Sequence, residues 1–296
     1  MPITLSAPAK LNLYLAVGSL RPDGYHDVST VLCALDLGDI VTVSPAAELT
    51  LVCEPDVGVP AESNLAWKAA MAMAQAFGRP ADFSINVYKR VPAGAGLGGG
   101  SADAAAVIAA ICAYWQVDAE TDGRPAAVAA SLGADVVFPL RAGCALYTDR
   151  GDVPASTLRA PDVWFAIACG AEPVPTAHAY ATLDGSSRGT APGPSAMEAA
   201  LESGDAAAVG AALYNDMTPA ALTLVPEIAE QLAFMADYDG CLGAALCGSG
   251  AAVFGLFADR ESAEAAAGGA VACGLWSAVA RPSARGTLDQ TTGANL

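Results

Sequence analysis

The stretch Val91-Pro-Ala-Gly-Ala-Gly-Leu-Gly-Gly-Gly-Ser-Ala-Asp103 carries the most structural information in this chain. It holds five glycines within residues 94–100, and the apolar run at 104–115 that follows predicts a buried helix. A glycine loop before a helix lets backbone N–H groups surround an anion, and the helix dipole adds partial positive charge. Ser101 and Asp103 are expected to cap this helix. The sequence therefore predicts a phosphate-binding loop.

Three phosphate-binding patterns compete for this loop. The Walker pattern requires Lys and then Ser or Thr after its last glycine, whereas here Gly100 and Ser101 follow Gly99, so it is excluded. Residues 94–99 fit the dinucleotide pattern, but no second strand ending in an acid follows about twenty residues on. Pro92 to Ala102, with one extra glycine, resembles the Pro-x-x-x-Gly-Leu-Gly-x-Ser-Ser/Ala loop of the GHMP kinases.

The charge of the chain excludes one class of partner. The formal net charge is −17, and a nucleic-acid-binding protein needs a basic surface, so no nucleic-acid partner is expected. The predicted phosphate loop still requires an anion. Backbone amides and a few placed cations can hold phosphates inside an acidic protein.

The chain shows no pattern for a membrane or a zinc site. The apolar run at 104–115 is too short to span a bilayer, which takes ~20 residues, and the N-terminus lacks the features of a signal peptide. A cytoplasmic protein without a membrane partner is expected. The eight cysteines contain no Cys-x-x-Cys pair, so reduced core thiols are expected. The sequence does not fix the oligomeric state.

Lys10 lies at the start of an alternating pattern at 11–15 that predicts a strand with one polar face. A period of two places Lys10 and Asn12 on the same face. A lysine that protects an edge strand from aggregation is a common alternative. The segment Ala-Pro-Ala-Lys-Leu-Asn-Leu at 7–13, however, resembles the N-terminal motif of the GHMP kinases.

Further motifs in the same order extend the resemblance along nearly the whole chain. They are Asn64-Leu-Ala-Trp-Lys-Ala-Ala, Leu132-Gly-Ala-Asp135-Val, Asn215-Asp216 and Gly248-Ser-Gly250. The last motif departs from the family, because Ala251-Ala252 replaces the usual Pro-Ser/Thr.

The resemblance implies an α+β GHMP kinase fold of two domains with the active site in the cleft between them. The N-terminal domain is expected at 1–153 and the C-terminal domain at 154–296. A polar loop is predicted at 184–194, and the polar tail from Arg281 onward is predicted to be disordered.

The family implies an ATP-dependent kinase that uses Mg²⁺, with Lys10 and Asp135 as catalytic residues and Ser101 as the candidate metal ligand. Asp135 would be the base, although it could instead cap a helix. Asn64 and Lys68 are weaker candidates for the adenine site. The residues implied to bind ATP are Pro92, Ala93, Gly94, Ala95, Gly96, Leu97, Gly98, Gly99, Gly100, Ser101 and Ala102.

The segment Arg21-Pro-Asp-Gly-Tyr-His26 resembles one branch of the family, whose alcohol acceptor carries a cytidine diphosphate group. Tyr25 could stack on a cytosine and His26 could bond its edge. With Asn12 and Thr176, they are the residues that the resemblance implies for acceptor binding. The segment argues against homoserine or mevalonate kinase. The presence of both Lys10 and Asp135 argues against a nucleotide sensor without catalytic activity.

Overall fold

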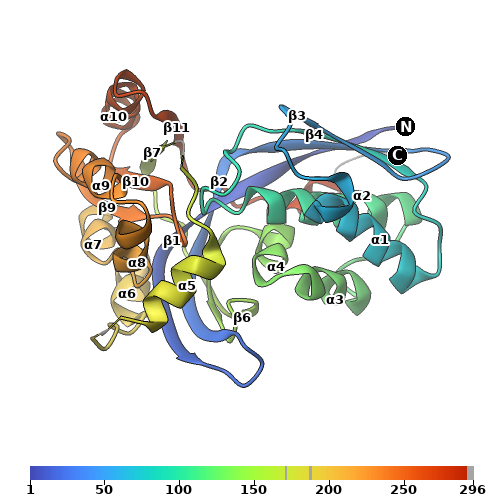
Figure 1. The fold of residues 1–296 in the computed structure, drawn as a ribbon, viewed down its shortest axis with the longest axis horizontal. Coiled ribbons are helices and arrows are strands. Elements are labelled where there is room, and N and C mark those ends of the chain that lie inside the picture. The colour runs from blue at the N-terminus through green and yellow to red at the C-terminus, as the bar shows by residue number, and fades with distance from the viewer. Residues whose placement is uncertain (171, 187–188, 292–296) are drawn as a thin grey trace.

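The chain folds into two α+β halves joined by two long strands, which Figure 1 shows running from one half to the other. The computed structural model describes residues 1–170, 172–186 and 189–291. The long strands are β1 (Ile3–Leu20) and β2 (His26–Pro45). They pair antiparallel from Ile3 opposite Val43 to Leu20 opposite His26. The predicted strand that carries Lys10 is thus part of β1.

The first half is a sheet covered by helices. Its strands follow the order β3-β4-β2-β1-β8, and β5 pairs with both β2 and β6. The other strands are β3 (Thr50–Glu54), β4 (Phe83–Tyr88), β5 (Cys144–Thr148), β6 (Val153–Leu158) and β8 (Tyr214–Asn215). The helices are α1 (Leu65–Phe77), α2 (Gly99–Trp115), α3 (Gly123–Leu132) and α4 (Ala134–Arg141), with a short 3₁₀ helix at Ala61–Ser63. Helix α2 is buried along most of its length because small alanines let it approach its neighbours closely.

The second half is an antiparallel sheet with helices packed around it. Its strand order is β11-β7-β10-β9, and Phe165, Phe254 and Phe257 are fully buried in its core. The strands are β7 (Trp164–Cys169), β9 (Cys241–Leu246), β10 (Val253–Phe257) and β11 (Trp276–Ala280). The helices are α5 (Thr176–Asp184), α6 (Ser195–Ser203), α7 (Ala206–Ala211), α8 (Thr218–Leu224), α9 (Ile228–Ala236) and α10 (Arg260–Ala272).

The predicted α+β class with two halves is confirmed. The boundary after residue 153 stays a proposal, and the described strands show how the chain passes between the halves. Strand β6 still pairs with β5 in the large sheet, and β8 later returns to pair with β1. Of the predicted polar loop at 184–194, residues 187 and 188 lie outside the described residues.

The disordered tail predicted from Arg281 onward is wrong as far as residue 291. Helix α11 (Thr287–Thr291) packs on the first half, and Thr287 is fully buried. The Gln290 side chain accepts a hydrogen bond from the Ser6 N–H and donates one to the Ser6 carbonyl. Polar composition misled the prediction, because these polar groups bond to the backbone of β1. Residues 292–296 lie outside the described residues.

Among the helices of the described residues, none combines the length and the apolar character needed to cross a bilayer.

Candidate active site

The glycine loop leads directly into α2. Gly94, Gly96 and Gly98 have φ angles of +72°, +80° and +74°, a conformation that favours glycine. Gly98 is the N-cap of α2, and no side chain caps the helix. The predicted capping by Ser101 and Asp103 is therefore wrong. The uncapped first turn leaves backbone N–H groups available to an anion.

A second loop holds the glycine loop in place. A Cβ atom at Gly96 would lie 2.1 Å from the Cys247 carbonyl oxygen, so only glycine fits this close approach. The Ala252 N–H donates a hydrogen bond of 3.0 Å to the Ala95 carbonyl. Ala251 and Ala252 are both buried. Of the two alanines that depart from the family motif, Ala252 thus takes part in fixing the phosphate loop through its backbone.

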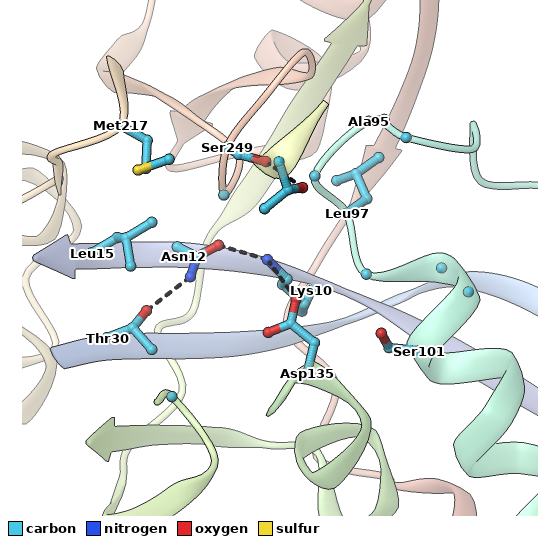
Figure 2. A pocket seen from close by; sticks show the side chains of 18 of the residues that line it. Lys10, Asn12, Leu15, Thr30, Ala95, Leu97, Ser101, Asp135, Met217 and Ser249 are labelled. Carbon is cyan, nitrogen blue, oxygen red and sulfur yellow. Dashed lines mark hydrogen bonds and ion pairs between the residues drawn. The ribbon is translucent and has the colours of Figure 1, made fainter. Parts of the chain in front are cut away.

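A pocket of about 420 Å³ lies between the glycine loop, β1 and α4. Figure 2 shows Lys10 and Asp135 side by side, joined by an ion pair, with Ser101 at the start of α2 nearby. The Lys10 Nζ lies 3.9 Å from the Asp135 Oδ2. The Lys10 side chain is 6 % exposed, whereas that of Asp135 is 49 % exposed. The lysine is therefore held in the wall, and the carboxylate is open to a ligand.

A chain of hydrogen bonds fixes the position of Lys10. Its Nζ donates to the Asn12 Oδ1 at 2.7 Å, and the Asn12 Nδ2 donates to the Thr30 Oγ1 at 2.8 Å. The Thr30 hydroxyl in turn donates to the Tyr14 carbonyl. Lys10 and Asn12 share one face of β1, as the period of two predicts. Thr30 was missed because its role depends on the pairing of β2 with β1.

Asp135 lies in the first turn of α4, and the N-cap is Gly133 with no capping side chain. The alternative role of Asp135 as a helix cap is therefore wrong. Across the pocket, the Thr176 Oγ1 lies 3.1 Å from the Ser249 Oγ, which brings two hydroxyl groups to the side opposite α4. Ser249 belongs to the Gly248-Ser-Gly250 motif, which departs from the family at Ala251-Ala252.

A buried ion cluster lies behind the glycine loop. Lys89 donates hydrogen bonds to Asp39 and, at 2.8 Å, to Asp103. Asp39 is fully buried and also accepts from the N–H groups of Arg90 and Val91. Burial raises the pKa of Asp103 to about 7, despite the neighbouring Lys89. Burial opposes the charge on Lys89, but Asp103 and Asp39 outweigh it and raise the pKa of the lysine.

Neither Tyr25 nor His26, the residues implied for the cytidine group, lines the main pocket, but Tyr25 contacts Arg150 and His26 contacts Tyr180, which do. Tyr25 is 54 % exposed. His26 is buried, and its ring stacks on Tyr180 with centroids 5.0 Å apart. The His26 Nε2 lies 2.8 Å from Asp184. Tyr180 lines the main pocket, and burial together with the Asp135 charge raises its pKa to about 12. The residues around Tyr180 in the sequence do not predict that it lines the pocket.

A second cavity of about 440 Å³ lies against the other side of the glycine loop. It shares Pro92 to Ala95 with the main pocket, and Val57, Arg90 and Trp276 also line it. Neither weak adenine candidate lines this cavity. Asn64 caps α1 through its side chain, and Lys68 lines a groove on the outer side of that helix.

Oxygen atoms suited to a magnesium ion are present in the main pocket. The Ser101 hydroxyl and the Asp135 carboxylate both line it, and Mg²⁺ prefers oxygen ligands. Within residues 1–170, 172–186 and 189–291, no group of three or more His, Cys, Asp or Glu side chains could hold a metal ion by itself.

A glycine loop, a lysine and an open carboxylate lie around one pocket, as the resemblance to the GHMP kinases implies. The models for the GHMP kinase N-terminal and C-terminal domains match residues 64–145 and 197–271. The chain belongs to the GHMP kinase family, and it is a kinase.

Curated relatives narrow the comparison to one member of the family. The chain is 40 % identical to the 4-diphosphocytidyl-2-C-methyl-D-erythritol kinase of Streptomyces coelicolor, over 90 % of this chain and 92 % of the relative. It is also 40 % identical to the enzyme of that name from Mycolicibacterium smegmatis, over 84 % and 79 % of the two chains.

Solved structures agree with this result. A crystal structure of 4-(cytidine 5'-diphospho)-2C-methyl-D-erythritol kinase matches with a TM-score of 0.77 and 32 % identity, covering 95 % of this chain and all of the other. A homoserine kinase from Cytophaga hutchinsonii matches with a TM-score of 0.74 at 20 % identity, over 97 % and 96 % of the two chains. At that identity, the second match supports the fold alone.

Proposed function

We propose that this kinase transfers the γ-phosphoryl group of ATP to the 2-hydroxyl of 4-diphosphocytidyl-2-C-methyl-D-erythritol. The products are the 2-phosphate and ADP, and the reaction belongs to the non-mevalonate route to isoprenoid precursors. The names of the relatives support this substrate. The observation that carries the chemistry is the Lys10–Asp135 pair, which faces a phosphate loop across one pocket.

Asp135 is proposed to accept the proton of the acceptor hydroxyl. Its carboxylate is exposed to the pocket, as a general base must be. Lys10 is positioned to stabilise negative charge on the transferred phosphoryl group, because Asn12 directs its ammonium group toward the pocket. No covalent intermediate is required, since phosphoryl transfer depends mainly on positioning and electrostatic stabilisation.

The phosphates of ATP are proposed to bind at the glycine loop, residues Pro92 to Ala102. The cavity lined by Val57, Arg90 and Trp276 shares part of that loop and contains neither Lys10 nor Asp135. This cavity is therefore the candidate adenine site, and Asn64 and Lys68 are no longer candidates for it. A Mg²⁺ ion bound with ATP would neutralise phosphate charge. Ser101 is its candidate protein ligand.

The acceptor is proposed to occupy the rest of the main pocket. Asn12 and Thr176 line it, and Tyr25 and His26, which contact Arg150 and Tyr180 of its lining, would bind the cytidine group. No nucleic-acid or membrane partner is proposed, and we propose a cytoplasmic location. These assignments follow the family resemblance and the net charge of −17.

The test is Asp135→Asn, measured by coupled detection of ADP release. Loss of a general base should lower kcat by on the order of 10²–10⁴, with little change in the affinity for ATP. The matched control is Asp237→Asn at the exposed end of α9, which should behave as wild type. An Asp135→Asn enzyme within a few-fold of wild type would remove Asp135 from the mechanism.

The same assay tests the substrate. Wild type should release ADP with the cytidine-containing acceptor and much more slowly with homoserine or mevalonate. Preference for either of the latter would overturn the proposed acceptor.

A further inference from the structure

Arg150 is a pocket residue that the sequence did not single out. It follows β5 in the turn that leads to β6. Among the described residues that line the main pocket, only Lys10 and Arg150 carry a positive charge. In a chain with a net charge of −17, a polyanionic ligand needs such local cations to offset repulsion.

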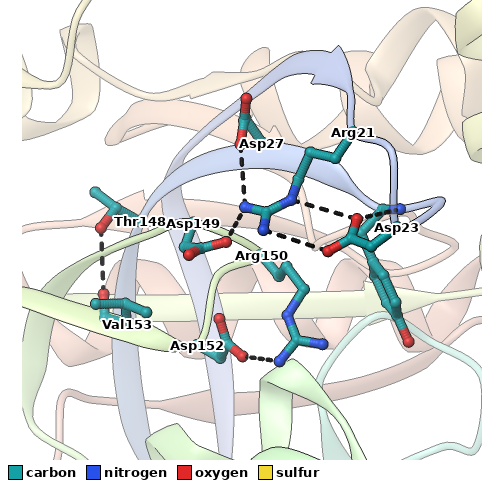
Figure 3. A network of polar contacts seen from close by, with 9 residues as sticks. Arg21, Asp23, Asp27, Thr148, Asp149, Arg150, Asp152 and Val153 are labelled. Atoms are coloured by element: carbon teal, nitrogen blue, oxygen red, sulfur yellow. Dashed lines mark hydrogen bonds and ion pairs between the residues drawn. The ribbon is translucent and has the colours of Figure 1, made fainter.

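Arg150 is held between a carboxylate and an aromatic ring. Its guanidinium bonds to Asp152, whose side chain is 7 % exposed. The Arg150 Cζ also lies 5.0 Å from the centroid of the Tyr25 ring. Because Tyr25 is 54 % exposed while this cation packs on it, part of the ring stays open to a ligand. Figure 3 shows Arg150 pointing toward Asp152 beside the Arg21 cluster.

Arg21, in contrast, is fully engaged with carboxylates. It contacts Asp23, Asp27 and Asp149, and Figure 3 shows the three acids arranged around its guanidinium. It does not line the main pocket. The two arginines lie in the same small region, but they differ in how many carboxylates they contact. Arg21 ties the β1–β2 hairpin to the β5–β6 turn, whereas Arg150 keeps N–H donors available on the pocket side.

We propose that Arg150 binds the diphosphate group of the acceptor and thereby selects an alcohol that carries a nucleoside diphosphate. This inference rests on the proposed function, in particular on Tyr25 as the cytidine contact. The order of groups along the acceptor is base, diphosphate, alcohol. The matching order in the protein is Tyr25, then Arg150, then the pocket with Lys10 and Asp135.

The guanidinium suits this role chemically. It has five N–H donors in a plane and matches phosphate oxygens in pairs. Asp152 accepts a hydrogen bond from Arg150 with only one carboxylate oxygen. Its other oxygen is buried without a hydrogen-bond partner among the described residues. Asp152 is thus a positioning residue, which fixes Arg150 but leaves most of its donors free. The Arg150 side chain is 31 % exposed, so a ligand can reach them.

The experiment measures inhibition by cytidine, CMP and CDP, each tested for competition against the acceptor at saturating ATP. Wild type should bind CDP most tightly and cytidine least tightly. A hydrogen bond to a charged group contributes ~1.5–3 kcal/mol, so Arg150→Gln should raise the inhibition constant of CDP about 10- to 100-fold. The inhibition constant of cytidine should change by no more than about threefold in Arg150→Gln. Arg150→Lys should recover part of the preference for CDP, since it restores the charge but not the paired donors.

Arg21→Gln is the matched control, because it disturbs the same region without removing a pocket cation. It should change the three inhibition constants by a common factor. If Arg150→Gln also shifts all three equally, Arg150 only supports Tyr25 and the inference is wrong. An unchanged preference for CDP refutes it as well. A wild-type enzyme that does not phosphorylate the cytidine acceptor would instead refute the proposed function, whatever the inhibitors show.

Discussion

Replacing Lys89 with Met tests whether the buried ion cluster fixes the phosphate loop. The substitution keeps the length of the side chain and removes the cation that contacts both Asp39 and Asp103, whose side chains are 0 % and 4 % exposed. Removing one partner from a buried ion pair costs about 3–5 kcal/mol, because the remaining charge is left without compensation. We expect a loss of unfolding free energy of this size, which is a large part of a typical stability of about 5–15 kcal/mol.

The two carboxylates should not share this loss equally. Asp39 keeps two backbone N–H donors at 2.6 and 2.8 Å, whereas Asp103 has one oxygen already without a partner and loses its contact with Lys89. Most of the penalty should therefore come from Asp103, which loses its ion pair and, because its pKa is already about 7 with Lys89 present, must take up a proton at neutral pH. The double variant Lys89→Met/Asp103→Asn should regain a large part of the stability, because an amide is cheaper to bury than a charge.

Urea denaturation gives the free energies, and kinetics on the folded fraction give the functional effect. Asp39 accepts from the N–H groups of Arg90 and Val91, which lead into the loop, so KM for ATP should rise more than kcat falls. The control is Lys68→Met on α1, a lysine outside the cluster, which should stay within ~0.5 kcal/mol of wild type. A Lys89→Met enzyme that loses less than about 1 kcal/mol, with unchanged KM for ATP, would refute the reasoning.

Two further predictions concern single side chains. Tyr25→Ala should raise KM for the cytidine-containing acceptor about 10- to 100-fold, because stacking contributes ~1–3 kcal/mol per base, while KM for ATP stays nearly constant. A rise in KM for ATP alone would assign Tyr25 to the donor site. Cys273 is the exposed cysteine and should give the fast phase of thiol labelling of the native protein, because burial raises the pKa of Cys112 to about 12 and that of Cys169 to about 11. A fast phase that persists in Cys273→Ser would contradict this.

The features that could be predicted from the sequence depend on short segments. The glycine loop and the face shared by Lys10 and Asn12 follow from local spacing, and both lie as predicted in the structure. Asp135 lies in the first turn of α4, which begins at Ala134 directly after the Leu132-Gly133 turn. Such features need only the neighbouring residues and the periods of helices and strands.

The features that could not be predicted depend on contacts between distant segments. Asp39 lies 50 residues before Lys89, and neither has a local signature of an ion pair. Asp103 was expected to cap a helix, because a short acid near a helix start often does so, but the helix begins earlier and Asp103 points to Lys89. The tail was misjudged in the same way, since the partner of Gln290 is Ser6 at the other end of the chain.

The three lysines bear on how an acidic chain would hold the two phosphate-bearing substrates that we propose. Lys68 lies on the outer side of α1, and the charge of Lys89 is offset by two carboxylates inside the fold. Only Lys10 remains for the pocket, so the other positive potential must come from the start of α2 and from Arg150. In our proposal, the start of α2 binds the phosphates of the donor ATP, and Arg150 binds the diphosphate of the acceptor. Loss of either should therefore weaken one substrate selectively, whereas loss of Lys10 should impair the transfer itself.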